Sequence, residues 1–296
     1  MSLEIQKLYT IRWAAGEIYK KAIDERTKSL SFTQIEVSSD LLGEPIPEEF
    51  RTPEPPRDSP SDETHMPKPI SPIGEKLLWY PKAVVRKDLK MKAIGNYAKG
   101  YPQGAVIHFT AGQWDKGINS AVDSISWGRD QGYLFLCISY DGQVIQTNPI
   151  NQWGYHCGTS KWKIDGNLRS GLSDTLVGIE ISNAGRLEKR GAKFFTWFNK
   201  EVPKEQVRYV DGKDPSQEEG YYQMYSKAQE AALVDLLLWL KRNNPDVFNL
   251  DYVLGHCEIS GMKGLGYWRK NDPGGALSMG MDKFRELLKN QNEGTI

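Results

Sequence analysis

Residues 104–109 read GAVIHF, a short apolar run with β-branched residues that ends on a histidine and a phenylalanine. Such a run predicts a buried β-strand, because branched side chains pack well on a pleated sheet. Further along, YLFLCIS and YDGQVIQTN read as two strands joined at Asp141-Gly142, a dipeptide typical of hairpin turns. The runs LVGIEISN (176–183) and NLDYVLGH (249–256) also have the length and composition of strands.

Helical patterns alternate with these strands. The segment NSAVDSISWGRD (119–130) has apolar residues at near-helical spacing, and residues 223–242 predict a longer helix that ends in basic residues, which suit the negative end of a helix dipole. MDKFRELLKN (281–290) predicts a closing helix. Strands interleaved with helices indicate an α/β fold, here with a single mixed central β-sheet flanked by helices.

The first 72 residues differ from the rest in composition. Residues 4–29 are rich in helix formers, and we expect one amphipathic helix there. Residues 44–72 hold nine prolines among acids and serines, a mixture that resists helix and sheet and indicates a linker or an extended arm. The sequence therefore predicts two parts, an N-terminal helix with a proline-rich arm (1–72) and a catalytic domain (73–296).

Charge and cysteine content exclude several classes of protein. The chain has 296 residues with 38 Lys+Arg against 38 Asp+Glu, so no net field favours nucleic acid or an anionic membrane surface. No run of eighteen apolar residues predicts a membrane span, and the N-terminal segment does not resemble a signal peptide. Three scattered cysteines make no disulfide framework. We expect a monomer.

Two histidines and one aspartate stand out as metal ligands. His108 and His256 each end an apolar strand-like run, where a rigid sheet can present a side chain at its rim, and Asp272 lies in the frame KNDPG. Two imidazoles and a carboxylate suit a catalytic Zn²⁺ site, which keeps a fourth position for water or substrate. The alternative is that each histidine is an ordinary hydrogen-bonded residue. The other two histidines of the chain are His156, in the globular part, and His65, in the proline-rich segment.

Five segments of the chain together resemble zinc-dependent N-acetylmuramoyl-L-alanine amidases of the bacterial, bacteriophage and peptidoglycan-recognition-protein superfamily. The resemblance spans roughly residues 79 to 290, and the segments occur in the family's order. They are GYPQGAVIHFTAG, QGYLFLCISYDGQVIQ, WGYHCGTS, LVGIEISNAGRL and GHCEIS followed by RKNDPGG.

The resemblance implies a role for each matching residue. It places zinc on His108, His256 and Asp272, and it implies that Lys270 stabilises the oxyanion. Glu180 matches the acid that acts on water in the bacterial branch, and Tyr133 matches the tyrosine of the phage and animal branch; both are present, so the general base stays open. The resemblance also implies that His156 lines the substrate groove, and we expect two further residues, Trp153 and Asn183, to bind substrate.

The implied reaction is hydrolysis of the amide bond between N-acetylmuramic acid and L-alanine, in peptidoglycan or muropeptides. The implied place of action is the bacterial cell wall or its fragments, as for an endolysin-like, periplasmic or secreted enzyme. One departure from the family is a Gly-rich insert that separates His256 from Lys270 more widely than in compact members.

The sequence also allows other classes of protein. Some relatives of this fold recognise peptidoglycan without cutting it, and a structural or interaction protein that works through residues 1–72 is a further alternative. A cysteine nucleophile is disfavoured, because Cys157 and Cys257 adjoin histidines and neighbouring side chains of an extended segment point to opposite faces. Residues 184–222, rich in aromatics, predict a functional loop that either contacts substrate or packs on the domain.

Overall fold

The computed structural model describes residues 8–11, 18–24, 29–32, 78–261, 264–267 and 269–294. The chain divides into two compact units, Met1–Pro69 and Ile70–Ile296. None of the helices within the described residues is long and apolar enough to cross a membrane.

The first unit contains strands where the sequence predicted a helix. β1 (Leu8–Ile11), β2 (Ile18–Asp24) and β3 (Ser29–Phe32) form an antiparallel sheet in the order β1-β2-β3, with Thr10 opposite Tyr19. The prediction of an amphipathic helix over 4–29 is therefore wrong for these residues. The apolar residues are spaced only loosely at helical intervals, whereas LYTI is made of residues that favour strands. The proline-rich segment 44–72 lies outside the described residues.

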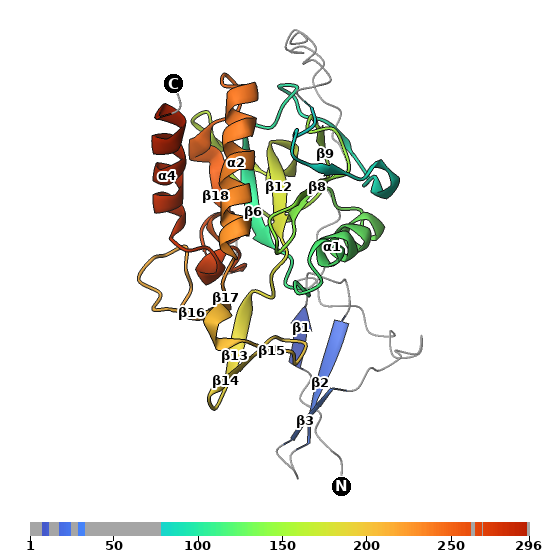
Figure 1. Cartoon of the computed structure of the whole chain (residues 1–296), viewed down its shortest axis with the longest axis vertical. Coiled ribbons are helices and arrows are strands. Elements are labelled where there is room, and N and C mark those ends of the chain that lie inside the picture. Colours follow the sequence, from blue (N-terminus) through green and yellow to red (C-terminus); the bar gives the residue numbers. More distant parts are fainter. Residues whose placement is uncertain are drawn as a thin grey trace. The chain divides into compact units, whose positions relative to one another are not determined.

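A six-stranded mixed sheet forms the centre of the second unit, in the order β18-β6-β12-β7-β8-β4. Strands β18, β6, β12 and β7 run parallel, and β8 pairs antiparallel with β7. The bounds are Val84–Val85 for β4, Gly104–Phe109 for β6, Leu136–Ile138 for β7, Val144–Gln146 for β8, Leu176–Ile181 for β12 and Val253–Gly255 for β18. The predicted mixed central sheet flanked by helices is confirmed (Figure 1).

Helices cover both faces of this sheet. On one face, Ile107, Ile179 and Ile138 pack in a cluster with leucines of α2 (Lys227–Asn243) and with Phe284 of α4 (Met281–Glu293). Figure 1 shows α2 and α4 side by side. On the other face, Cys137 and Ile145 pack with Ala121 and Ile125 of α1 (Ile118–Asp130). The alternation of side chains along each strand therefore places separate apolar clusters on the two faces of the sheet.

A second, five-stranded sheet occupies the region where the sequence predicted a functional loop. Its order is β15-β14-β13-β17-β16, and all the assigned pairs are antiparallel. The bounds are Arg186–Arg190, Lys193–Phe195, Glu201–Val202, Val207–Val210 and Gly220–Gln223 for β13 to β17. The helix predicted from residue 223 begins later as α2, after the capping residue Ser226, because Gln223 ends β17.

Short elements complete the second unit. Two small antiparallel pairs join β5 (Gly95–Asn96) to β9 (Gln152–Trp153) and β10 (Lys161–Ile164) to β11 (Asn167–Ser170). The one-turn helix α3 (His256–Ile259) follows β18 directly. Single 3₁₀ turns lie at Lys87–Leu89, Leu172–Asp174, Lys204–Gln206, Leu250–Tyr252 and Gly274–Ala276.

Candidate metal centre

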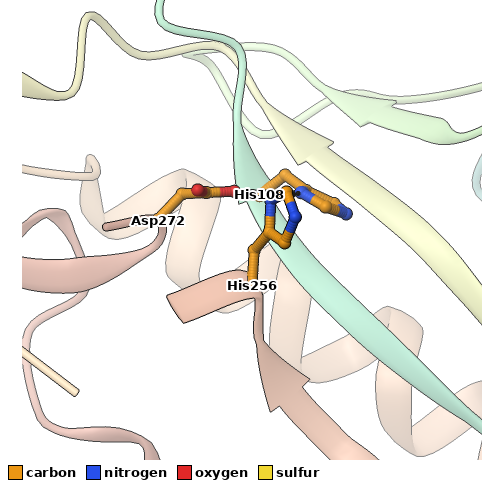
Figure 2. A group of neighbouring side chains, drawn as sticks. All are labelled: His108, His256 and Asp272. Atoms are coloured by element: carbon orange, nitrogen blue, oxygen red, sulfur yellow. Dashed lines mark hydrogen bonds and ion pairs between the residues drawn. The ribbon is translucent and has the colours of Figure 1, made fainter. Parts of the chain in front are cut away.

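Two neighbouring parallel strands bring the predicted histidine ligands together. His108 is the fifth residue of β6, and Gly255, the last residue of β18, pairs with Ile107. His256 is the next residue after Gly255, so the register of the two strands places it level with His108. Asp272 joins them from the segment after α3, where its carbonyl accepts a hydrogen bond from the Cys257 N–H at 2.9 Å. Figure 2 shows the three side chains converging.

The three side chains meet through one atom each. Oδ2 of Asp272 lies 2.9 Å from Nδ1 of His108 and 3.0 Å from Nδ1 of His256, and the two Nδ1 atoms are 3.1 Å apart. All three residues are buried, with at most 6% of their surface exposed. They form a group that could hold a metal ion.

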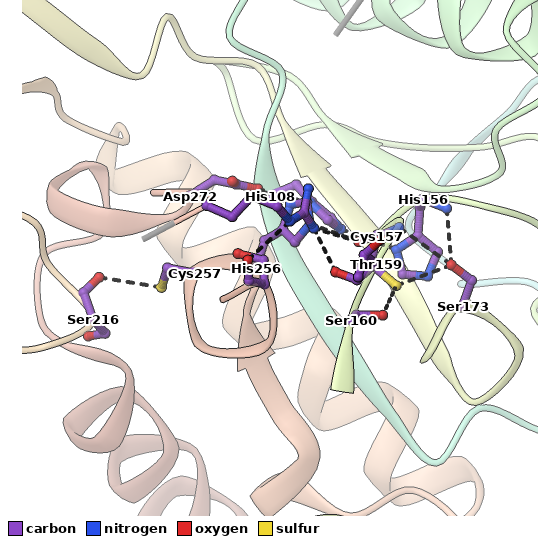
Figure 3. A network of polar contacts seen from close by, with 12 residues as sticks. His108, His156, Cys157, Thr159, Ser160, Ser173, Ser216, His256, Cys257 and Asp272 are labelled. Atoms are coloured by element: carbon purple, nitrogen blue, oxygen red, sulfur yellow. Dashed lines mark hydrogen bonds and ion pairs between the residues drawn. The ribbon is translucent and has the colours of Figure 1, made fainter. Parts of the chain in front are cut away.

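Hydrogen bonds on the far side of each histidine ring fix its orientation. Nε2 of His256 lies 3.0 Å from the carbonyl oxygen of Cys157, which can only accept, so Nε2 carries the proton and Nδ1 presents a lone pair. Nε2 of His108 lies 3.2 Å from Nδ1 of His156, whose own Nε2 donates to the carbonyl of Leu176 at 2.9 Å. Figure 3 shows this network.

Burial and mutual charge set the ionisation of this group. Burial lowers the pKa of His256 to about 4, only partly offset by Asp272. Burial opposes ionisation of Asp272, but the attraction of His256 and His108 outweighs it and holds the pKa of that carboxyl below its usual range. Burial also lowers the pKa of His156 well below its ordinary value. At neutral pH the rings of His256 and His156 are therefore neutral.

Glu180 lies beside this group on β12, where it pairs in register with His108. The residue is partly exposed, but its Oε2 atom is buried and has no hydrogen-bond partner among the described residues. Burial raises the pKa of Glu180 to about 7; His108 and Lys270 oppose this rise and Asp272 adds to it. A carboxyl with a pKa near neutrality can both accept and return a proton.

Lys270 precedes Asp272 by two residues and is partly buried. Burial lowers its pKa, while the charges of Asp272 and Glu180 act in the opposite direction. The charge of Lys270 therefore interacts with both carboxyl groups.

Tyr133 has a different environment from the other predicted catalytic residues. Its ring packs against Trp127 of α1 at a centroid distance of 5.7 Å, and the residue lies three positions before β7 begins. Burial raises the pKa of its hydroxyl. Tyr133 packs against the apolar cluster that includes Ile125 of α1, and it forms a β-bridge with Tyr155.

The three predicted substrate contacts also lie in different surroundings. His156 touches His108, whereas Trp153 is in β9 and packs edge-on against Tyr155 at 6.0 Å. Asn183 is fully buried, and its amide group donates to the carbonyls of Gln223 and Met224. These contacts make Asn183 a support for the segment after β12, and they do not favour its predicted contact with substrate.

Two supporting residues were missed by the sequence reasoning. Glu258, in the turn that begins with His256, forms a buried ion pair with Arg285 of α4, with two N–O distances of 2.9 Å. The Glu258 carboxylate also accepts from the Gly255 N–H at 2.8 Å. A glutamate three residues after a helix cap is a capping signal that the segment GHCE contains. The pairing with Arg285 has no such local signal.

The Gly-rich insert between His256 and Lys270 folds back on this turn. The Gly266 N–H donates to the carbonyl of Glu258 at 2.9 Å, and the Arg269 guanidinium donates to the carbonyls of Ser260 and Thr159 at 3.0 and 2.7 Å. The long spacing in sequence is therefore compatible with a compact group in space.

An α/β domain with a buried His–His–Asp group at the carboxyl ends of its parallel strands defines this chain as a protein with a candidate catalytic metal centre. A family profile described as N-acetylmuramoyl-L-alanine amidase matches residues 98–275, more than half of the chain and all of this group. The chain belongs to the N-acetylmuramoyl-L-alanine amidase family.

Similar proteins include N-acetylmuramoyl-L-alanine amidase AmiD of Escherichia coli (strain K12), which is 32% identical over 97 residues. That match covers 31% of this chain and 33% of the relative, so the chain spans about a third of the length of the curated relative that it matches. Among solved structures, a selenomethionine AmpD derivative has a TM-score of 0.42 at 17% identity, covering 71% of this chain and 96% of that chain. AmpDh3 from Pseudomonas aeruginosa, in complex with anhydromuramic pentapeptide, has a TM-score of 0.39 at 19% identity, covering 64% and 60%.

Proposed function

We propose that this protein is a zinc-dependent amidase that hydrolyses the bond between N-acetylmuramic acid and L-alanine in peptidoglycan or muropeptides. The observation that carries the proposal is the convergence of three acceptor atoms, Nδ1 of His108, Nδ1 of His256 and Oδ2 of Asp272, within 3.1 Å of one another. The bond that is cut is inferred from the family, and the metal-assisted mechanism is inferred from the buried His–His–Asp group.

The arrangement of these three acceptor atoms is more favourable with a metal ion between them than without one. Nε2 of His256 carries that ring's proton, so the Nδ1 atom that faces Oδ2 of Asp272 is unprotonated. Lone pairs that face each other at such distances repel unless a cation lies between them. Neighbouring ligands of a tetrahedral zinc, each about 2.0–2.1 Å from the ion, are about 3.4 Å apart, so the observed triangle is only a few tenths of an ångström too small.

Three protein ligands leave the fourth position of a zinc ion open, as catalytic zinc sites require. When bound to these three residues, zinc would supply Lewis acidity, which would polarise an amide carbonyl and lower the pKa of water. Glu180 has an accessible protonation change near neutral pH, so it takes the proton of the attacking water and returns it to the departing L-alanine nitrogen. Lys270 opposes the negative charge that develops on the carbonyl oxygen.

A two-part experiment tests this proposal. Metal analysis of the purified protein is expected to find one zinc per chain, and His108→Ala is expected to lose it. Mass spectrometry of digests is expected to find stem peptides with a free N-terminal L-alanine, both from purified peptidoglycan and from soluble muropeptides, in a ratio that reveals the preferred substrate.

Two results would overturn the proposal. Full zinc occupancy in His108→Ala would refute the ligand assignment. A zinc-loaded protein that binds peptidoglycan but releases no peptide would instead make the chain a recognition module without catalytic activity.

A further inference from the structure

One dipeptide, His156–Cys157, contacts the Nε2 atoms of both histidines of the candidate metal centre, on the sides of the rings that face away from Asp272. The side chain of His156 meets Nε2 of His108, and the carbonyl of Cys157 accepts from Nε2 of His256. The dipeptide is itself held by Ser173, whose Oγ accepts from the N–H groups of His156 and Cys157 at 3.2 and 3.4 Å (Figure 3). Ser173 is only 4% exposed, so this support is part of the core.

The hydrogen bonds run from His108 through His156 to the carbonyl of Leu176, and this carbonyl determines the direction of each of them. The carbonyl of Leu176 cannot donate, so the 2.9 Å contact requires a proton on Nε2 of His156. In the neutral ring this leaves a lone pair on Nδ1, which accepts the Nε2–H of His108 at 3.2 Å. The remaining nitrogen of His108, Nδ1, then has no proton and points its lone pair toward Asp272.

Without an acceptor at His156, the His108 ring has a competing arrangement. Its proton can move to Nδ1 and be donated to Oδ2 of Asp272, which is only 2.9 Å away. That hydrogen bond satisfies both groups without a metal, and an incoming ion would have to displace the proton. The acceptor on His156 removes this alternative by giving the proton a partner on the opposite side of the ring.

We propose that His156 is a positioning residue, which holds His108 in the tautomer that presents Nδ1 to a metal ion and so raises metal affinity. The proposal rests on the proposed function only in that the site binds a metal; it does not depend on which bond is cut. The family resemblance implied that His156 contacts the substrate; in this proposal His156 instead contacts His108, a residue that binds the metal.

A glycine of the central sheet leaves space for the imidazole ring of His156. A Cβ atom at Gly178 of β12 would lie 2.7 Å from Cγ and 2.9 Å from Nδ1 of His156, closer than real Cβ contacts allow. Glycine at 178 therefore makes the space in which the imidazole lies between Leu176 and His108.

Three substitutions at one position separate the acceptor from the rest of the side chain. His156→Asn places an amide oxygen near the position of Nδ1 and keeps an acceptor for His108. His156→Gln reaches the position of Nε2 and can still donate to Leu176, but it offers no acceptor where Nδ1 was. His156→Ala removes both groups.

We expect zinc affinity, measured by competition with a chromophoric chelator, to fall by about 10–100-fold in His156→Ala and His156→Gln, as is usual when a partner of a metal-bound histidine is lost. His156→Asn should stay within a few-fold of the parent. Nitrogen-15 NMR of the metal-free proteins provides a second readout. His108 should be protonated on Nε2 in the parent and in His156→Asn, and shifted toward the Nδ1 tautomer in the other two.

The outcomes discriminate clearly. Equal zinc affinity in all four proteins would overturn the proposal, as would a His108 tautomer that does not change in His156→Ala. Equal losses in Asn, Gln and Ala variants would show that His156 acts by filling space. If His156→Ala fails to fold, Gly178→Ala gives a second test, because it displaces the ring and should reproduce the loss of affinity. A protein that shows all the expected shifts yet cuts no amide would refute the proposed function alone.

Discussion

Glu180 has the environment expected of a general base, and Tyr133 does not. The Glu180 carboxyl is next to His108 in the sheet and has a pKa near neutrality, whereas the Tyr133 ring packs on Trp127 and its pKa is raised by burial. A phenol with a reference pKa of about 10 is mainly a hydrogen-bond donor at neutral pH.

The first prediction follows from this difference. Glu180→Gln should keep zinc and lower the turnover number by about 10²–10⁴, the usual contribution of general acid-base catalysis. Tyr133→Phe should cost much less. Turnover of a defined muropeptide, with zinc content measured in parallel, checks both. An active Glu180→Gln beside an inactive, zinc-loaded Tyr133→Phe would reverse the assignment.

The raised pKa of Glu180 also predicts that the stability of the metal-free protein depends on pH. Its pKa rises from an ordinary value of 4.5 in the unfolded chain to about 7 in the folded protein, so the folded state resists ionisation. Below pH 4.5 both states are protonated and the residue has no effect. As pH rises from 4.5 to 7 the unfolded state loses its proton first, so Glu180 destabilises the fold increasingly.

Glu180→Gln removes this penalty. With zinc chelated, the melting temperature of Glu180→Gln should match that of the parent near pH 4.5 and exceed it near pH 8. Thermal unfolding at a series of pH values measures the gap. A gap that is constant with pH, or that closes as pH rises, would contradict the raised pKa.

At the scale of elements, the attachment of α3 to α4 positions His256. Arg285 forms two 2.9 Å contacts with the buried carboxylate of Glu258 and donates to the carbonyl of Val253 at 3.0 Å. These bonds fix the turn that starts at His256 to the end of β18. Removing one partner of a buried ion pair is costly because the other charge stays buried without a partner.

Arg285→Leu should therefore lower the free energy of unfolding by about 3–5 kcal/mol and weaken zinc binding. Lys289→Leu is a matched control on the same helix, since its ion pair with Asp251 is exposed and should contribute no more than about 1 kcal/mol. Urea unfolding and zinc affinity measure the two effects. Similar losses in the two variants would show that the buried pair has no special role.

At the scale of the whole molecule, the chain divides between Pro69 and Ile70, and the first described residues of the second unit, from Leu78 on, already contact the central sheet. Leu78 accepts a hydrogen bond from the Ile150 N–H at 2.9 Å, and the Tyr80 N–H donates to Gln146 at 2.9 Å. All the residues of the candidate site belong to the second unit.

A protein of residues 73–296 should therefore fold, bind zinc and hydrolyse muropeptides at a rate similar to that of the full chain. Circular dichroism, metal analysis and peptide release, compared with the full chain, test this expectation. A shortened protein that is folded and zinc-loaded but releases no peptide would assign a catalytic role to residues 1–72.

Local patterns in the sequence predicted five of the six strands of the central sheet, all except β4 (Val84–Val85), and the three residues of the candidate metal centre. GAVIHF coincides with β6, and the hairpin at Asp141-Gly142 joins β7 to β8, because alternation and turn residues are local signals of local structure. His108 and His256 could be paired from sequence because each ends a strand, and carboxyl ends of parallel strands meet at one edge of a sheet. Asp272 completed the predicted ligand set, and the resemblance of the motifs added Lys270 and Glu180.

Tertiary structure alone decided which atom of each histidine faces the metal site. The partner that orients His256 is the carbonyl of Cys157, 99 residues away, and the partner of His108 is a ring 48 residues away. It also decided that residues 186–223 form a second sheet and that residues 8–32 include three strands. Hydrogen bonds between distant segments and the pKa shifts that follow burial depend on packing, and a local pattern of residues does not encode either of them.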